Sequence, residues 1–194
     1  MGDHFQVLAD VDAGEAEAPA LAASLVKWLL RDGVITSDVT DCVLGAEHGY
    51  PPGPNFWAVV NQPNERFLSL RTNGVEISTE RRVFYPGQGE FGAVDCPSCG
   101  QTVILSDPST GAVSDDWERF GEALSTWHAG GSDLVRCPHC DQPVRFNEWQ
   151  WSDQPFAVGF LGLTSWNWPE LSDWFADQVA RHLGHRVIRT GGKL

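Results

Sequence analysis

The side chains of this sequence whose type and spacing best fit a defined chemistry are those of two cysteine pairs. Cys96 and Cys99 belong to the run Cys-Pro-Ser-Cys, and Cys137 and Cys140 belong to Cys-Pro-His-Cys. A gap of two residues lets both sulfurs of a pair reach one ion from a tight turn, which the proline stiffens. Four thiolates at this spacing are typical of a tetrahedral zinc site with Zn–S distances of ~2.3 Å. We therefore predict that these four cysteines bind one Zn²⁺ ion.

The predicted zinc is structural, because four thiolates fill the tetrahedral shell, whereas a catalytic zinc keeps one position open. Two alternatives stay open at this point. The C-P-x-C pairs could act as redox dithiols, and His139, inside the second pair, could ligate the metal. Two copies of the same turn favour zinc over redox chemistry, and we expect His139 to face solvent. The fifth cysteine, Cys42, lies in an apolar run and is expected to be a buried, inert thiol.

No other motif in the sequence predicts a reaction. Patterns for a phosphate-binding loop, a serine nucleophile elbow and a zinc protease helix are missing, as is the His-x-Glu of zinc deaminases. The six histidines are scattered. The sequence therefore favours a non-enzymatic role, and the alternative is an enzyme whose site lies away from the zinc.

The charge of the chain bears on its partners. The 194 residues have a net charge of −13, and residues 94–146 carry eight acids against three bases. Nucleic-acid binding draws most of its affinity from Lys and Arg on phosphates. Recognition of nucleic acid through the cysteine region is therefore the least favoured function.

The C-terminal segment is locally basic within this acidic chain. It contains Arg181, His182, His185, Arg186 and Arg189, with no acid after Asp177. These side chains could contact an anion or an acidic partner. They could instead pair with the acidic N-terminal half, which we favour because surface charges commonly pair or are solvated.

Apolar content of 42%, with nine Trp and ten Phe, predicts a folded protein with an aromatic core. Trp149 and Trp151 are two residues apart, as are Trp166 and Trp168, so each pair should lie on one face of a strand. We expect one pair in the core. The other could lie in the core or anchor a partner.

In the N-terminal part, periodicity predicts a strand over 4–11 and a helix over 19–31. A second strand is predicted over 41–45. A hairpin is predicted from strands over 66–71 and 75–78, because Asn-Gly at 73–74 favours a tight turn.

In the cysteine region, a helix with a capping box at Asp115 is predicted between the two cysteine turns. Strands over 102–105 and 144–147 should follow those turns. The C-terminal part is predicted to form a buried strand over 156–163, a helix over 169–183 and a strand over 185–189.

Strand–helix–strand order at both ends predicts an α+β protein with a split ferredoxin-like core. That core would comprise residues 1–92 and 148–194. The predicted hairpin lies within it, and a zinc ribbon with a helical insert would occupy residues 93–147.

The C-P-x-C-G and C-P-x-C turns resemble those of zinc-ribbon proteins over about residues 93–147. The remainder resembles small acidic bacterial proteins of uncharacterised role. What the ribbon resemblance implies is a structural metal and a rigid platform.

The favoured function is a zinc-stabilised module that docks a partner protein. One version is an immunity- or antitoxin-like inhibitor of a partner with a basic surface. No run resembles a signal peptide, and no stretch reaches ~18 apolar residues. We therefore expect no membrane span and a cytoplasmic location, where paired cysteines bind metal more often than they form disulfides.

Overall fold

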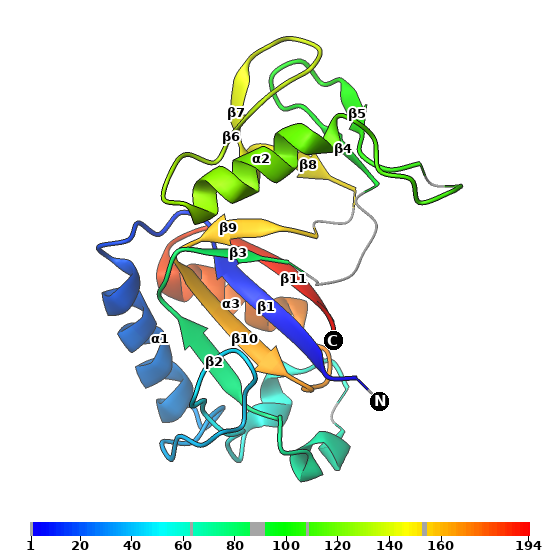
Figure 1. Ribbon diagram of the computed structural model, residues 1–194. Helices are drawn as coiled ribbons and strands as arrows, with labels where there is room; N and C mark the ends of the chain where they lie inside the picture. The colour runs from blue at the N-terminus through cyan, green and yellow to red at the C-terminus, as the bar shows by residue number, and fades with distance from the viewer. Residues whose placement is uncertain (1, 63, 86–91, 108, 153–154) are drawn as a thin grey trace.

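A four-stranded antiparallel sheet forms the centre of the molecule (Figure 1). The computed structural model describes residues 2–62, 64–85, 92–107, 109–152 and 155–194. The strands lie in the order β11–β1–β10–β2. Their bounds are β1 (His4–Asp10), β2 (Val75–Ser78), β10 (Leu161–Trp166) and β11 (Val187–Lys193). This mixed α+β architecture matches the predicted class.

Two helices cover one face of this sheet: α1 (Ala18–Arg31) and α3 (Asp173–Leu183). They pack against each other through the rings of Trp28 and Phe175, whose centroids are 6.0 Å apart. Helix α3 begins four residues later than predicted, because the hydroxyl of Ser172 accepts a hydrogen bond from the amide of Phe175 and caps it there. Gly184, at a φ of 75°, ends it.

Two neighbouring strands of the sheet, β2 at its edge and β10 beside it, are joined to a second pair of strands beyond a bend. Strand β3 (Arg82–Phe84) follows β2, and it pairs with β9 (Ala157–Gly159), which precedes β10. The predicted strand over 156–163 is therefore broken at Phe160. The bend places the Phe84 ring over Gly162, where a Cβ atom would lie 2.5 Å from a ring carbon.

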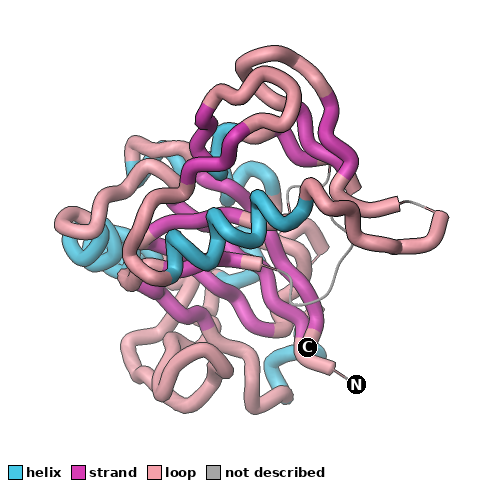
Figure 2. The backbone as a smooth tube through the Cα atoms, turned by 45° about the horizontal axis from the view of Figure 1, so that its top comes forward, coloured by secondary structure: helices cyan, strands magenta, loops and turns pink. Residues whose placement is uncertain are grey.

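The cysteine-bearing part of the chain lies beyond this second pair (Figures 1 and 2). It contains two small antiparallel sheets, of order β5–β4–β8 and β6–β7, and helix α2 (Trp117–His128). The strands are β4 (Ala93–Asp95), β5 (Thr102–Ile104), β6 (Leu134–Arg136), β7 (Pro143–Arg145) and β8 (Gln150–Trp151). Helix α2 was predicted, but Asp116 is its N-cap, and no side chain caps it.

Two predictions for the N-terminal part are wrong. No strand covers 41–45, because the buried side chains of Cys42 and Val43 pack beside Trp166 in a loop. The hairpin does not form either. The 66–71 segment lies mostly in a 3-10 helix, and β2 pairs with β10. A type I′ turn needs positive φ at both central residues, and neither Asn73 nor Gly74 has one.

The 3-10 helices are η1 (Phe56–Val59), η2 (Glu65–Ser69) and η3 (Phe146–Glu148). The aromatic core that composition predicted is present, and both pairs of tryptophans, at 149 and 151 and at 166 and 168, are buried.

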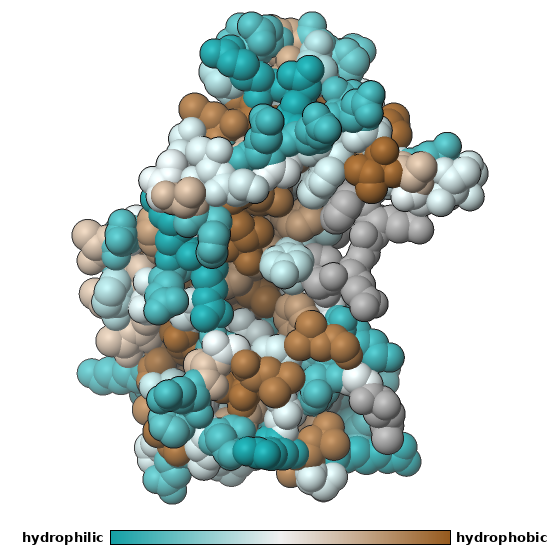
Figure 3. All heavy atoms as spheres, in the orientation of Figure 1, coloured by the Kyte–Doolittle hydropathy of each residue, from teal (hydrophilic) through white to brown (hydrophobic). Residues whose placement is uncertain are grey.

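The opposite sheet face, away from α1 and α3, is hollowed and shows apolar side chains (Figure 3). In the described part of the chain, no helix is both long and apolar enough to cross a membrane.

Candidate metal centre

The sulfurs of Cys96, Cys99, Cys137 and Cys140 all lie within 4.8 Å of one another. Cys96 Sγ is 4.0 Å from Cys140 Sγ, and Cys99 Sγ is 3.8 Å from Cys137 Sγ. Sulfurs at ~2.3 Å from one tetrahedral zinc ion lie ~3.8 Å from each other. Their spacing therefore fits a single ion of the size of zinc, and these residues could hold it.

The two cysteine turns have the same backbone design. In the first, the amide of Gly100 donates to the carbonyl of Cys96, and Gly100 has a φ of 69°. In the second, the amide of Asp141 donates to the carbonyl of Cys137, and Asp141 has a φ of 58°. Positive φ is natural for glycine and tolerated by aspartate, so each turn can reverse directly after its second cysteine.

The neighbouring sulfurs shift each other's ionisation. Burial opposes ionisation of Cys96, but the amides of Cys99 and Ser98 donate to its sulfur and bring its pKa down to about 7. The Gln101 amide favours the thiolate of Cys99, yet burial and the three other cysteine sulfurs outweigh it and raise the pKa of Cys99 to about 12. Four thiols this close cannot all ionise unless a cation shares their charge. The donor set therefore fits a divalent metal ion.

A histidine links the second turn to the first. His139 is exposed, as predicted, and its Nε2 lies 3.2 Å from the carbonyl oxygen of Thr102 in β5. The hydroxyl of Thr102 in turn donates to Asp95 in β4. His139 therefore ties the two turns together from outside the sulfur cluster. Sequence spacing gave no signal for this contact.

The basic C-terminal residues mostly contact groups within the chain. Arg186 pairs with Asp12 at 2.8 Å and with Glu148 at 2.7 Å, and Arg189 pairs with Asp173 at 3.0 Å. The other contacts involve His185 with Asp10, His182 with Ser24 and Trp28, and Arg181 with the carbonyl of Asp177. These five residues form no shared cluster at the cysteines, and their role as an anion or partner contact stays a proposal.

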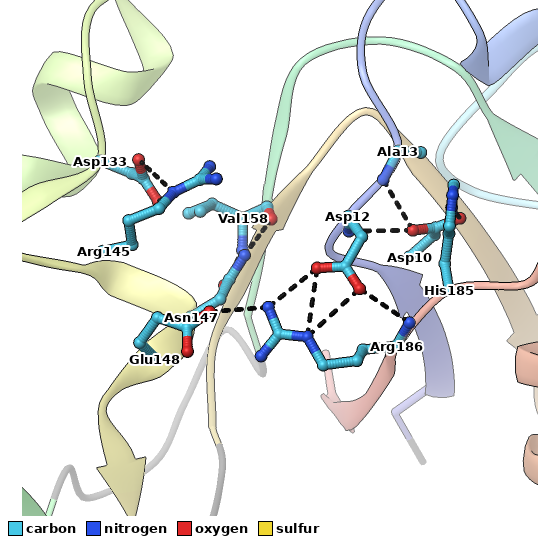
Figure 4. A network of polar contacts seen from close by, with 10 residues as sticks. All are labelled: Asp10, Asp12, Ala13, Asp133, Arg145, Asn147, Glu148, Val158, His185 and Arg186. Atoms are coloured by element: carbon cyan, nitrogen blue, oxygen red, sulfur yellow. Dashed lines mark hydrogen bonds and ion pairs between the residues drawn. The ribbon is translucent and has the colours of Figure 1, made fainter. Parts of the chain in front are cut away.

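The pairs of Arg186 join the main sheet to the cysteine-bearing part (Figure 4). Asp12 follows β1, whereas Glu148 lies in η3, after β7. The Arg186 guanidinium hydrogen-bonds to Asp12 and lowers the pKa of that carboxyl. Beside it, Asn147 exchanges two hydrogen bonds with the backbone of Val158, at 2.7 and 2.9 Å. Polar contacts therefore hold the cysteine-bearing part against the rest of the molecule, in addition to its covalent connections along the chain.

The pair of His185 and Asp10 should make stability depend on pH. Asp10 is fully buried, and its carboxylate lies 2.8 Å from His185 Nδ1. This hydrogen bond raises the pKa of His185 above its usual 6.5. The stabilisation that protonated His185 gains from Asp10 is therefore complete below pH 6.5. It is lost as the pH rises through the pKa of His185 in the folded protein.

Urea denaturation of the protein and of His185→Gln, from about pH 5 to about pH 8, should show this difference. The free energy of unfolding of the wild type should fall relative to that of the variant as the pH rises. A constant difference between the two proteins over the whole range would contradict the assignment.

No family model matches this chain, and the searches of curated proteins and of solved structures found no match. Inference about its role therefore rests on its own residues.

Proposed function

We propose that this protein is a non-enzymatic, zinc-stabilised module that binds a partner protein. The observation that carries the proposal is the closed set of four sulfurs, all within 4.8 Å of one another. Four thiolates leave no coordination position for a substrate or an activated water. The metal would therefore build a rigid platform instead of reacting.

Charge supports a partner with a basic surface. Zn²⁺ bound by four thiolates carries a net charge of −2, and the 94–146 segment already has a formal charge of −5. On α2, Glu118 and Glu122 are exposed and one turn apart. A surface of this sign speeds association with basic proteins and repels phosphate. An immunity- or antitoxin-like inhibitor of a basic partner is one form of this function.

The same charges weigh against nucleic acid as the ligand. Arg186 and Arg189, which could have contacted phosphates, pair with carboxylates instead. An enzyme with its site in the α+β core and a remote zinc is the second candidate. The cavity on the open sheet face is the observation that favours it.

We further infer that the chain has a split ferredoxin-like core, built from residues 1–92 and 148–194, and an inserted zinc ribbon over 93–147. The strand order β11–β1–β10–β2, with α1 after the first strand and α3 before the last, supports this topology. Strand β4, inside this insert, also pairs with β8, so its strand contacts reach Trp151, which lies beyond residue 147. We propose that the whole protein acts in the cytoplasm.

The experiment combines metal analysis with partner capture. We expect one zinc per chain and, from the native host, a stoichiometric partner that binds more weakly as salt is added. With the purified partner, Glu118→Lys/Glu122→Lys should weaken binding far more than Glu118→Gln/Glu122→Gln. Catalytic turnover without a stoichiometric partner would reject the proposal, as would equal effects of the two double variants.

A further inference from the structure

A cavity of about 370 Å³ opens on the sheet face that lies away from α1 and α3. It lies between the strands of the main sheet, the loop at Leu44 and Gly45, and strand β3. Figure 3 shows this face hollowed, with apolar side chains inside the hollow. The volume falls within the range of ~300–1,000 Å³ that is typical of small-molecule sites.

The sheet builds the floor and one wall of the cavity. Val7, Thr164 and Glu76 are neighbours across β1, β10 and β2, so their side chains stand in one row on the same face. Phe5 and Trp166, with ring centroids 5.3 Å apart, form the wall at one end. Phe84, whose ring covers Gly162, forms the wall at the other end. The cavity is therefore apolar at its ends, and Thr164 and Glu76 make its floor partly polar.

An ion pair crosses this polar floor. The Glu76 carboxylate is only 4% exposed, and its Oε1 lies 2.7 Å from Nη1 of Arg82, whose side chain is 34% exposed. In the described part of the chain, neither Glu76 Oε2 nor the Thr164 hydroxyl has a hydrogen-bond partner. The Arg82 guanidinium, which carries five N–H groups, donates only to Glu76 among the same residues. Donor and acceptor capacity is therefore left over inside the cavity.

The surroundings of this pair suggest more than a structural role. Burying an ion pair costs desolvation energy, and an apolar pair is often at least as stable. The loop approaches the carboxylate so closely that a Cβ atom on Gly45 would lie 2.0 Å from Glu76 Oε2. The rim carries exposed apolar side chains, namely Leu44, Tyr85 and Leu194. An apolar rim around a buried carboxylate with a half-exposed, incompletely satisfied guanidinium partner matches the mostly apolar lining with a few polar groups that is typical of small-molecule sites.

We propose that this cavity binds a small zwitterion with an apolar side chain, of the hydrophobic α-amino acid class. The ligand carboxylate would meet the free N–H groups of Arg82, and its ammonium group would meet Glu76 Oε2 and the Thr164 hydroxyl. Its apolar part would lie among Phe5, Phe84 and Trp166. Glu76 and Arg82 offer one partner for each sign of charge, so a ligand with a single charged group would leave either the free N–H groups of Arg82 or Glu76 Oε2 without a partner, which costs binding free energy. A zwitterion avoids this cost. The site is separate from the cysteine cluster and does not depend on the metal.

Three matched probes test the ligand class on the wild-type protein. L-phenylalanine has both charged groups, phenethylamine lacks the carboxylate, and 3-phenylpropanoate lacks the amine. Each would be titrated while the backbone amide signals are followed by NMR. We expect L-phenylalanine to shift the signals of Phe5, Glu76 and Thr164, and each truncated probe to bind about tenfold more weakly or worse.

A double variant tests the ion pair without leaving a lone buried charge. Glu76→Gln/Arg82→Gln keeps side chains of similar size that can still hydrogen-bond, so the fold should persist. We expect it to weaken L-phenylalanine binding about tenfold or more. The matched control is Asp41→Asn/Arg71→Gln, which removes an exposed ion pair outside the cavity and should leave binding unchanged.

Three results would overturn the proposal: no shift at the cavity residues with L-phenylalanine, a truncated probe that binds equally well, or unchanged binding by a folded double variant. If the double variant fails to fold, the probe series on the wild-type protein still decides.

Discussion

Replacing Cys137 by serine should abolish metal binding and unfold the cysteine-bearing part of the chain. Cys96 and Cys137 are buried, whereas Cys99 is exposed, so the buried pair would combine the proposed ligand role with a packing role. Zinc binding to sites of this kind contributes ~10–16 kcal/mol of apparent free energy. A whole domain is typically stable by only ~5–15 kcal/mol. Loss of the metal should therefore remove the ordered packing of this part of the chain.

Cys42→Ser is the matched control, because Cys42 is also buried but lies beside Trp166, away from the other four cysteines. We expect one zinc per chain in this variant and none in Cys137→Ser. After treatment with a strong chelator, the wild-type protein should show the same near-UV circular dichroism spectrum as Cys137→Ser. Full zinc content in Cys137→Ser, or an unchanged melting temperature after chelation, would contradict a structural metal.

The cysteine cluster could be predicted because its information is local. Each pair lies within four residues, and the expectation that four sulfurs share one ion predicts that two turns separated by 37 residues meet, as their sulfurs do. The strand–helix order at each end of the chain could also be predicted, because it depends on periodicity over short windows. In both cases, the prediction needs only the residues of one segment or the coordination chemistry expected of a single ion.

Pairing between distant segments could not be predicted in this way. The Asn73-Gly74 dipeptide favours a hairpin locally, but Gly74 instead lies against Cys42, where a Cβ atom would be 2.1 Å from the sulfur. Trp168 Nε1 donates to the carbonyl of Asn73 and holds it in place. Strand β2 then pairs with β10, and Glu76 lies opposite Thr164. Tertiary contacts therefore outweighed the local preference.

The cavity was missed for the same reason. Glu76 and Arg82 are six residues apart, and the sequence placed Glu76 in one arm of a predicted hairpin and assigned Arg82 to no element. The bend between β2 and β3 brings the two side chains together over the sheet instead. One signal was present in the sequence, namely an acidic residue between apolar neighbours in a strand, and it gains meaning only once the pairing with β10 is known.

The second large effect is expected at Phe120, on the inner face of α2. Its side chain has no exposed surface, and its ring centroid lies 4.9 Å from that of Trp149 and 5.5 Å from that of Trp151. Trp151 in turn contacts Phe156, directly before β9. Truncating a buried Phe to Ala typically costs ~3–5 kcal/mol, because a cavity is left behind. We expect Phe120→Ala to lower the free energy of unfolding by about that amount.

The same variant tests whether the aromatic cluster joins the cysteine-bearing part to the main sheet. If it does, urea unfolding of Phe120→Ala should remain a single transition at lower denaturant, with the signals of α2 and of β10 lost together. Leu134→Ala, which truncates an exposed apolar side chain in β6, should change stability by ~0.5 kcal/mol or less. Two separate transitions in the wild type, with only the first moved by Phe120→Ala, would show instead that the two parts unfold independently.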